Sequence, residues 1–127
     1  MNRPLKKILY IEDERDIQEI SKIALGDIGG YELEVCSSGE EAIDKGPAFL
    51  PDLIILDVMM PGMDGIATFN ALQKIPSTKL VPVVFMTAKI QQSEIQIYLN
   101  MGAIGIIHKP FDPMTLADKV KEIWENC

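Results

Sequence analysis

Short apolar runs alternate along the chain with longer segments in which apolar residues recur at helical spacing. The runs predict five strands, at residues 7–11, 31–36, 53–57, 81–86 and 104–107. Each run is followed by a segment with the spacing of an amphipathic helix. Strands that alternate with helices pair in parallel and are covered on both faces. The pattern therefore predicts an α/β fold of five strands and five helices.

Boundary signals mark the first two expected helices. Gly29-Gly30 is expected to end the first, and its apolar face is expected to consist of Ile17, Ile20, Ala24 and Ile28. Ser38 and Glu41 form a capping box that opens the second helix. Because proline lacks an N–H and clashes with the preceding turn, Gly46-Pro47 is expected to end it.

The last three expected helices are marked in the same way. Asp64 is expected to cap a helix that runs to about Ile75, and residues 90–101 predict the next one. Asp112 as N-cap and Pro113 at the first helical position are expected to open the last helix. The apolar face of that helix is expected to consist of Leu116, Val120, Ile123 and Trp124.

Composition narrows the class of protein. The 127 residues suit one domain spanning residues 1–127, and the net charge of −7 disfavours direct binding of nucleic acid or an anionic membrane. With two cysteines, Cys36 and Cys127, and one histidine, a His/Cys zinc site is excluded.

No apolar run approaches the ~20 residues that span a bilayer. No secretory segment precedes the first strand, so a cytoplasmic protein is expected.

Carboxylate, hydroxyl and ammonium side chains that could take part in binding or catalysis stand at the ends of four of the five predicted strands. They are Glu12 and Asp13, Asp57, Thr87, and Lys109. Open parallel sheets bind their ligands at this edge, so the side chains are expected to converge there. Three carboxylates in one place repel one another, and a hard cation such as Mg²⁺, with Mn²⁺ as the expected substitute, relieves that repulsion. Asp57 ends a buried strand and is the expected nucleophile in metal-assisted phosphoryl chemistry, with Lys109 and Thr87 stabilising the phosphoryl oxygens.

Four segments at these positions resemble the receiver domain of two-component response regulators. They are Ile11–Glu14, Leu56–Gly65, Met86–Lys89 and Lys109–Phe111. The segments occur in the order and at the spacing of the family, and the resemblance covers essentially the whole chain. It implies a flavodoxin-like (βα)5 doubly wound sandwich whose parallel sheet has the strand order 2-1-3-4-5.

The resemblance also implies a role for each site residue. Asp57 matches the phosphoacceptor. The metal ligands are expected from Glu12, Asp13, Asp57 and the backbone carbonyl of Met59. Phosphate binding is expected from Met59, Thr87, Ala88 and Lys109, with Thr87 as the hydroxyl that moves to the phosphoryl group. The Lys109-Pro110 peptide bond matches one that is usually cis. Ile106 departs from the family pattern, because many members have Tyr or Phe there.

Partners follow from the same resemblance. The phosphoryl donor is expected to be a phosphohistidine on a sensor histidine kinase or a histidine phosphotransfer protein. A stand-alone receiver, like the chemotaxis regulators, is expected to bind its protein target through the face of residues 90–127. Either a monomer or a phosphorylation-dependent dimer agrees with the sequence. The protein is expected to be no enzyme in the ordinary sense, although it promotes its own phosphorylation and dephosphorylation.

Three other functions fit the pattern less well. An aspartate-nucleophile phosphatase commonly carries a second Asp two residues after the first, where this chain has Met59. A flavin or nucleotide binder needs a phosphate-receiving loop after the first strand, where Glu12-Asp13-Glu14 would repel phosphate. A receiver that only docks, without phosphorylation, would not need the full set of acids, hydroxyl and amine.

Overall fold

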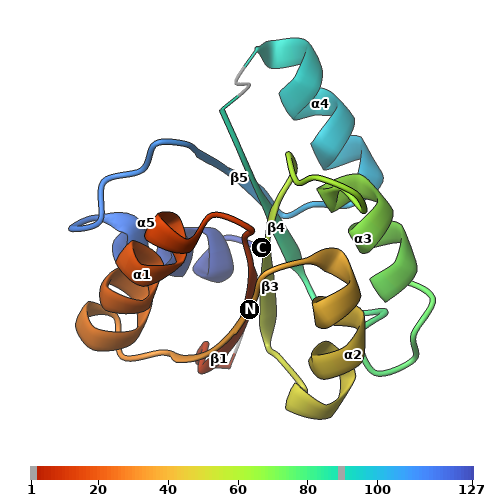
Figure 1. Ribbon diagram of the computed structural model, residues 1–127. Helices are drawn as coiled ribbons and strands as arrows, with labels where there is room; N and C mark the ends of the chain where they lie inside the picture. Colours follow the sequence, from red (N-terminus) through yellow and green to blue (C-terminus); the bar gives the residue numbers. More distant parts are fainter. Residues whose placement is uncertain (1–2, 89–90) are drawn as a thin grey trace.

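Five parallel strands form one sheet in a computed structural model that describes residues 3–88 and 91–127 (Figure 1). The strands are β1 (Lys7–Ile11), β2 (Glu32–Cys36), β3 (Leu53–Asp57), β4 (Val83–Thr87) and β5 (Gly105–His108). Their order in the sheet is β2-β1-β3-β4-β5. The predicted α/β class is therefore confirmed, together with the strand order that the resemblance implies.

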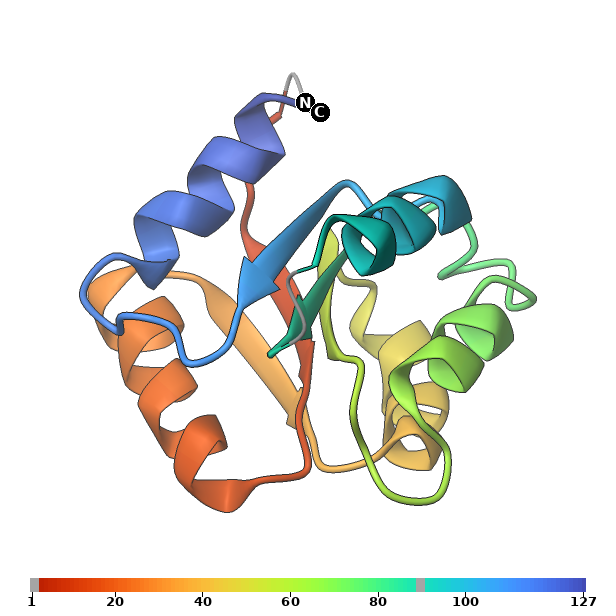
Figure 2. The same ribbon diagram turned by 90° about the horizontal axis from the view of Figure 1, so that it is seen from above.

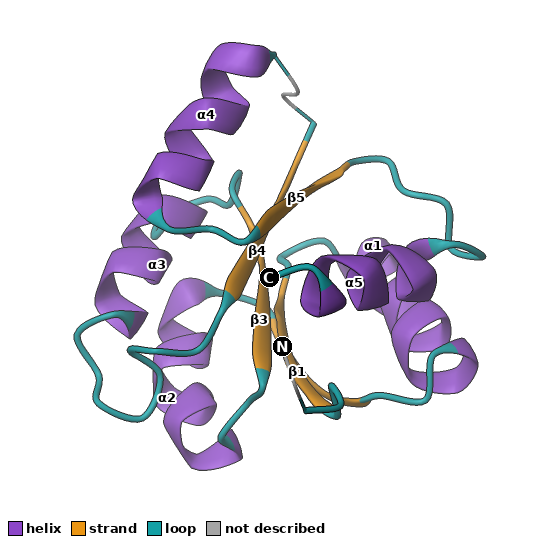
Figure 3. Cartoon of the chain, turned by 180° about the vertical axis from the view of Figure 1, so that it is seen from behind, coloured by secondary structure: helices purple, strands orange, loops and turns teal. Residues whose placement is uncertain are grey.

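Helices cover both faces of the sheet (Figure 2). One face carries α1 (Arg15–Ser21), its π-helical continuation η1 (Lys22–Ile28) and α5 (Leu116–Glu125). The other face carries α2 (Gly39–Phe49), α3 (Gly65–Leu72) and α4 (Gln92–Met101). The view from behind shows the same arrangement, with α2, α3 and α4 on one side of the sheet and α1 and α5 on the other (Figure 3). Among the described residues, no helix has the length and apolar character needed to cross a membrane.

Every residue of β3 and β4 is buried, which explains why their sequences show apolar runs rather than alternation. Side chains on successive positions point to opposite faces of the sheet. Leu56 and Phe85 pack toward α2, α3 and α4, whereas Ile55 and Met86 pack toward α1, η1 and α5. Two apolar layers thus hold the ends of β3 and β4 in fixed positions.

The first helix differs from its predicted form. Its apolar face was expected at Ile17, Ile20, Ala24 and Ile28, but Ile20 and Ile28 are 42% and 48% exposed. Ile20 lies in α1, before the helix changes, but Ile28 lies past the change to π-helix at Lys22, where the Gly29 N–H donates to the Ala24 carbonyl five residues back at 3.1 Å. A π-helical turn is wider than an α-helical one, so a face calculated for 3.6 residues per turn is wrong here. Ala24 is buried as predicted, and the other buried residues are Gln18, Ser21 and Leu25.

The second helix does not end at Gly46-Pro47, as predicted, but continues to Phe49. The missing N–H of Pro47 leaves one helical bond unmade, yet Phe49 packs against the core and Leu50 ends the helix in the left-handed region at φ 54°. At the other end, Ser38 accepts from the Glu41 N–H at 3.1 Å, as the capping box predicts. The Glu41 carboxylate, however, accepts from the Ser37 N–H rather than from that of Ser38.

The remaining predicted helices are present, but the ends of α3 and α5 differ from the prediction. Asp64 caps α3 by accepting from the Ala67 N–H at 2.8 Å, and α3 ends at Leu72 rather than near Ile75. The described part of α4 begins at Gln92, and the predicted start at residue 90 lies outside the described residues. The last helix begins at Leu116, because Asp112 closes a turn to the Met114 N–H at 2.9 Å instead of capping the helix. Leu116, Val120 and Trp124 are buried as predicted, and Ile123 packs against them in part.

The carboxylate of Asp52 holds the N-terminal segment to the sheet at the end where β1 and β3 begin. It accepts from the backbone N–H groups of Lys7 at 2.9 Å and Lys6 at 3.2 Å, and it pairs with the Arg3 guanidinium. Burial raises the pKa of Asp52, but the hydrogen bonds from Arg3, Lys7 and Lys6 outweigh burial and lower it below its ordinary value. The ionised form therefore stabilises the fold.

We expect Asp52→Asn to lower the free energy of unfolding by about 1–2 kcal/mol at pH 7, because hydrogen bonds to a charged group are lost. The pKa is depressed in the folded state, so this contribution is complete above the unfolded value of about 3.9. It disappears as the pH falls through the lower folded value. Urea unfolding at pH 7 and pH 3 measures the difference. Asp44→Asn, at an exposed position on α2, is the control and should change little at either pH.

Candidate functional site

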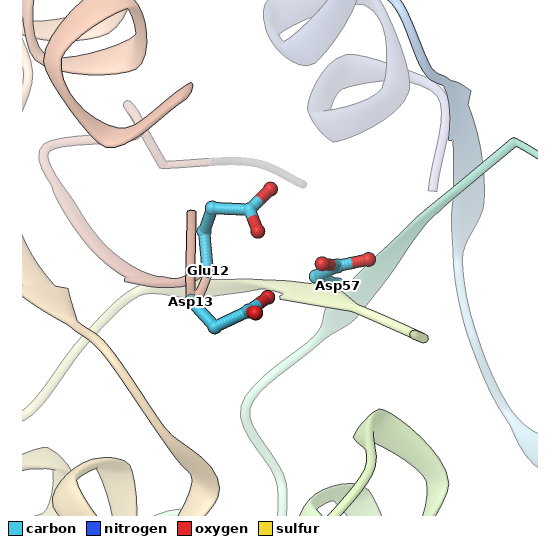
Figure 4. A group of neighbouring side chains, drawn as sticks. All are labelled: Glu12, Asp13 and Asp57. Atoms are coloured by element: carbon cyan, nitrogen blue, oxygen red, sulfur yellow. The ribbon is translucent and has the colours of Figure 1, made fainter. Parts of the chain in front are cut away.

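Three carboxylates meet where β1 and β3 end (Figure 4). Glu12 and Asp13 directly follow β1, and Asp57 is the last residue of β3. The two strands are paired neighbours, with Ile11 opposite Leu56, so the residues past them lie side by side. One oxygen from each carboxylate lies within 4.8 Å of the others. The predicted convergence of the three acids is present.

Lys109 supplies a positive charge to these acids. Its Nζ donates to Glu12 Oε1 at 2.7 Å and to Asp57 Oδ2 at 3.2 Å. Lys109 follows β5 and is tied to the end of β4, since its N–H donates to the Thr87 carbonyl at 2.9 Å. The Lys109-Pro110 peptide bond is cis, as the resemblance implies. One ammonium thus faces two of the three carboxylates.

Burial governs the charge states in this cluster. Burial, together with the nearby Asp57, raises the pKa of Glu12 to about 7, although the Lys109 ammonium opposes the shift. Burial also disfavours the charged form of Lys109, but its contacts with Glu12 and Asp57 outweigh burial and raise its pKa. The ammonium therefore stays charged at neutral pH, whereas the raised pKa of Glu12 makes that carboxylate take up a proton more readily than an exposed glutamate does.

One oxygen of the cluster lacks a hydrogen-bond partner among the described residues. Asp13 Oδ1 is buried and unpaired. By contrast, Glu12 Oε2 accepts from the Glu14 N–H, and Asp57 Oδ1 accepts from the Met59 N–H, each at 3.2 Å. A buried carboxylate oxygen without a donor is costly, and a cation removes that cost. The oxygens are hard ligands, so the cluster fits Mg²⁺ better than a soft metal ion.

The remaining predicted residues lie beside the acids. Met59 is two residues past Asp57, and Thr87 and Ala88 come at the end of the neighbouring strand β4. The Val58 N–H donates to the Met86 carbonyl at 3.0 Å, which ties the segment after Asp57 to β4. The structure therefore brings every predicted site residue to one edge of the sheet.

Gln18 and Gly65 shape the site but were not singled out from the sequence. Gln18 is buried, and its Nε2 donates to the Glu12 carbonyl and to Ser37 Oγ, at 2.5 and 3.0 Å. A polar residue on the sheet-facing side of a helix was the signal available for it. Gly65 lies against the end of β3, where a Cβ would come within 2.7 Å of Val58 Cα and closer still to the Asp57 carbonyl oxygen. Only glycine lets α3 begin this near to Asp57.

Comparison with known proteins agrees with this arrangement. Residues 8–121 match the response regulator receiver domain family. The chain is 36% identical over 118 residues to the alkaline phosphatase synthesis transcriptional regulatory protein PhoP of Bacillus subtilis, covering 93% of this chain and 48% of that protein. It is 35% identical over 117 residues to the phosphate regulon transcriptional regulatory protein PhoB of Rhizobium meliloti, covering 92% of this chain and 51% of that protein. The chain thus spans about half the length of these curated relatives.

Solved structures give the same result. The chemotaxis response regulator CheY4 of Vibrio cholerae superposes with a TM-score of 0.85 at 31% identity, covering 94% of this chain and 99% of that one. A response regulator from Chloroflexus aurantiacus superposes with a TM-score of 0.82 at 32% identity, covering 97% and 99% of the two chains. This chain belongs to the response regulator receiver domain family. It is a component of two-component signalling, in a family whose members are generally not classical enzymes and interact with histidine kinases or phosphotransfer proteins.

Gly65→Ala should lower the free energy of unfolding by about 1–3 kcal/mol, because the added methyl group forces the start of α3 away from β3. Gly26→Ala is the matched control, since a Cβ there meets nothing nearer than Leu33 Cδ1 at 3.8 Å. Urea unfolding of both variants provides the comparison. Equal midpoints for the two variants would show that the close approach to Asp57 is not required.

Asp13→Asn should stabilise the protein by about 1–2 kcal/mol in buffer containing a metal chelator, because one of three mutually repelling carboxylates is removed. Glu14→Gln serves as the control, because Glu14 is the exposed neighbour and its loss should change stability by less than about 0.5 kcal/mol. The urea midpoint is the readout. A midpoint for Asp13→Asn below that of the wild type contradicts the repulsion argument.

Proposed function

We propose that Asp57 accepts a phosphoryl group from a phosphohistidine of a sensor histidine kinase or a histidine phosphotransfer protein. The observation that carries this proposal is the contact between the Asp57 carboxylate and the Lys109 ammonium at 3.2 Å, beside the carboxylates of Glu12 and Asp13. The acceptor is fixed at the end of a fully buried strand. A nucleophile, a cation and two metal-ligating acids are the parts that this reaction requires.

In the proposed reaction an Asp57 oxygen attacks phosphorus and the P–N bond of the phosphohistidine breaks. The imidazole keeps the electron pair of that bond, and the product is an aspartyl phosphate. Lys109 is the cation that balances the phosphoryl charge, while Thr87 Oγ1 and the backbone N–H groups of Met59 and Ala88 are the proposed donors to its oxygens. The proposed Mg²⁺ ligands are the carboxylates of Glu12, Asp13 and Asp57 and the Met59 carbonyl. Bound there, the ion neutralises phosphoryl oxygens.

The Lys109 ammonium also covers the proposed acceptor. The side chain of Asp57 is only 2% exposed, and that of Lys109 is 14% exposed. We propose that the ammonium moves when a phosphoryl donor approaches the carboxylate. The phosphoryl oxygens, which are negatively charged like the carboxylate, then become a new partner for Lys109. In this proposal, Lys109 both controls access to Asp57 and neutralises the charge of the phosphoryl group.

The proposal extends to the whole chain. We propose that residues 1–127 form one receiver unit in the cytoplasm, and that phosphorylation alters a protein-binding surface within residues 90–127. A phosphatase acting on free substrates is disfavoured, because the Met59 side chain cannot serve as the general acid two residues after Asp57. A docking module without phosphorylation is disfavoured by the ion pair that Lys109 makes with two buried acids.

Incubation of the wild type with acetyl phosphate and Mg²⁺ should add one phosphate, detected by intact mass. The adduct should be labile in base and should fail to form when the metal is chelated. Asp57→Asn should abolish the adduct, because the amide is not a nucleophile toward phosphorus. Asp16→Asn, an exposed acid on α1, should remain fully competent. Phosphate found on Asp57→Asn would place the acceptor elsewhere.

Lys109→Ala should slow phosphorylation about 100-fold, because a positioned charge that stabilises the phosphoryl oxygens is lost. The variant should also lose most of the structural response, measured as the change in amide hydrogen exchange on phosphorylation. Lys119→Ala, an exposed lysine of α5, provides the control and should behave as wild type. A full response in Lys109→Ala contradicts the anchoring role of the ammonium.

A further inference from the structure

Tyr98 is the most deeply buried side chain in the described part of α4. Tyr98 is the buried residue of this helix, whereas its neighbours Ile97 and Leu99 are 55% and 40% exposed. The Tyr98 ring packs edge-on against Phe85 of β4, with ring centroids 5.3 Å apart. Phe85 packs in the same manner against Phe69 of α3, at 5.4 Å. The aromatic contact with β4 is therefore a main anchor of α4, next to the partly buried Met101 at its end.

The strand that Tyr98 contacts leads directly to the proposed phosphorylation site. Phe85 and Thr87 are two positions apart in β4, so their side chains point to the same face of the sheet. In the register of the sheet, Phe85 lies opposite Leu56 and Met86 lies opposite Asp57. A shift of Thr87 at the end of β4 would therefore act close to Phe85, the residue that contacts the Tyr98 ring.

A second connection passes through a hollow of about 560 Å³. Tyr98 lines one side of it, and the segment that follows Asp57 lines the other, with the residues Val58, Met59, Met60 and Pro61. The hollow gives the ring unfilled space next to the loop that a phosphoryl group would displace. The connection through β4 and the connection through the hollow therefore both lead from Asp57 to Tyr98.

We infer that Tyr98 is the positioning residue that couples α4 to phosphorylation of Asp57, an inference that rests on the proposed function. A phosphoryl group adds a charge of about −1.5 to −2 and three acceptor oxygens at the end of β3. The loop after Asp57 and the end of β4 rearrange to meet it. The Tyr98 ring then packs deeper into the hollow, and α4 follows, since Tyr98 is the buried side chain among its described residues. Packed cores convert small shifts of this kind into movements of whole elements.

The test is amide hydrogen exchange across residues 92–101, before and after treatment with acetyl phosphate and Mg²⁺, with the adduct verified by intact mass. In the wild type, exchange should slow by at least about fivefold on phosphorylation. Tyr98→Phe keeps the ring and should retain this response, whereas Tyr98→Leu should reduce it to less than about twofold. Leu99→Ala alters an exposed residue of the same helix and should respond as wild type.

The outcomes separate this inference from the proposed function. A phosphorylated protein whose α4 exchange is unchanged, or in which Tyr98→Leu responds as the wild type does, overturns the inference and leaves the phosphoacceptor intact. Absence of any adduct removes the proposed function and the inference together. If Tyr98→Leu does not fold, Phe85→Leu removes the other ring of the contact, and a full response in that variant would falsify the coupling.

Discussion

Mutual repulsion among three carboxylates is the constraint on which the rest of the site depends. Glu12, Asp13 and Asp57 are held with one oxygen of each within 4.8 Å of the others, and an isolated chain would separate them. Pairing of β1 with β3 forces them together, because both strands run in the same direction and end at the same edge. The free energy that opposes this arrangement is offset elsewhere, by the two apolar layers that bury β3 and β4 completely.

The Lys109 ammonium determines which carboxylate oxygens of the cluster remain free to bind a further cation. It contacts Glu12 and Asp57 but leaves Asp13 Oδ1 without a partner among the described residues. The cluster therefore keeps an affinity for a further cation although two of its acids are already paired. A rigid sheet holds the acids, whereas the ammonium is carried on a long side chain from the loop after β5. This division of tasks suits a site that has to admit and release a charged group.

Much of this could be predicted from the sequence, because strand ends are easy to locate in buried apolar runs. Asp57 directly follows such a run, and the parallel order of the strands brings Glu12, Asp13 and Lys109 to the same edge. What escaped prediction depends on tertiary contacts. Packing of Phe49 carries α2 past Pro47, and the turn closed by Asp112 delays the start of α5. The coverage of Asp57 by Lys109 depends on side-chain positions that no local pattern encodes.

The π-helical segment η1 determines which residues face the sheet at the end of the first helix and where the chain enters β2. Its wider turns present Ala24 and Leu25 to the sheet and deliver the chain to Gly29-Gly30 and then to β2. Loss of one residue from this segment would permit ordinary α-helical bonding, but it would also turn everything after it by about 100°. Either the apolar contacts of η1 or the alignment of Glu32 with Lys7 would then fail. Chain length between β1 and β2 is thus constrained by helix packing and by strand register at the same time.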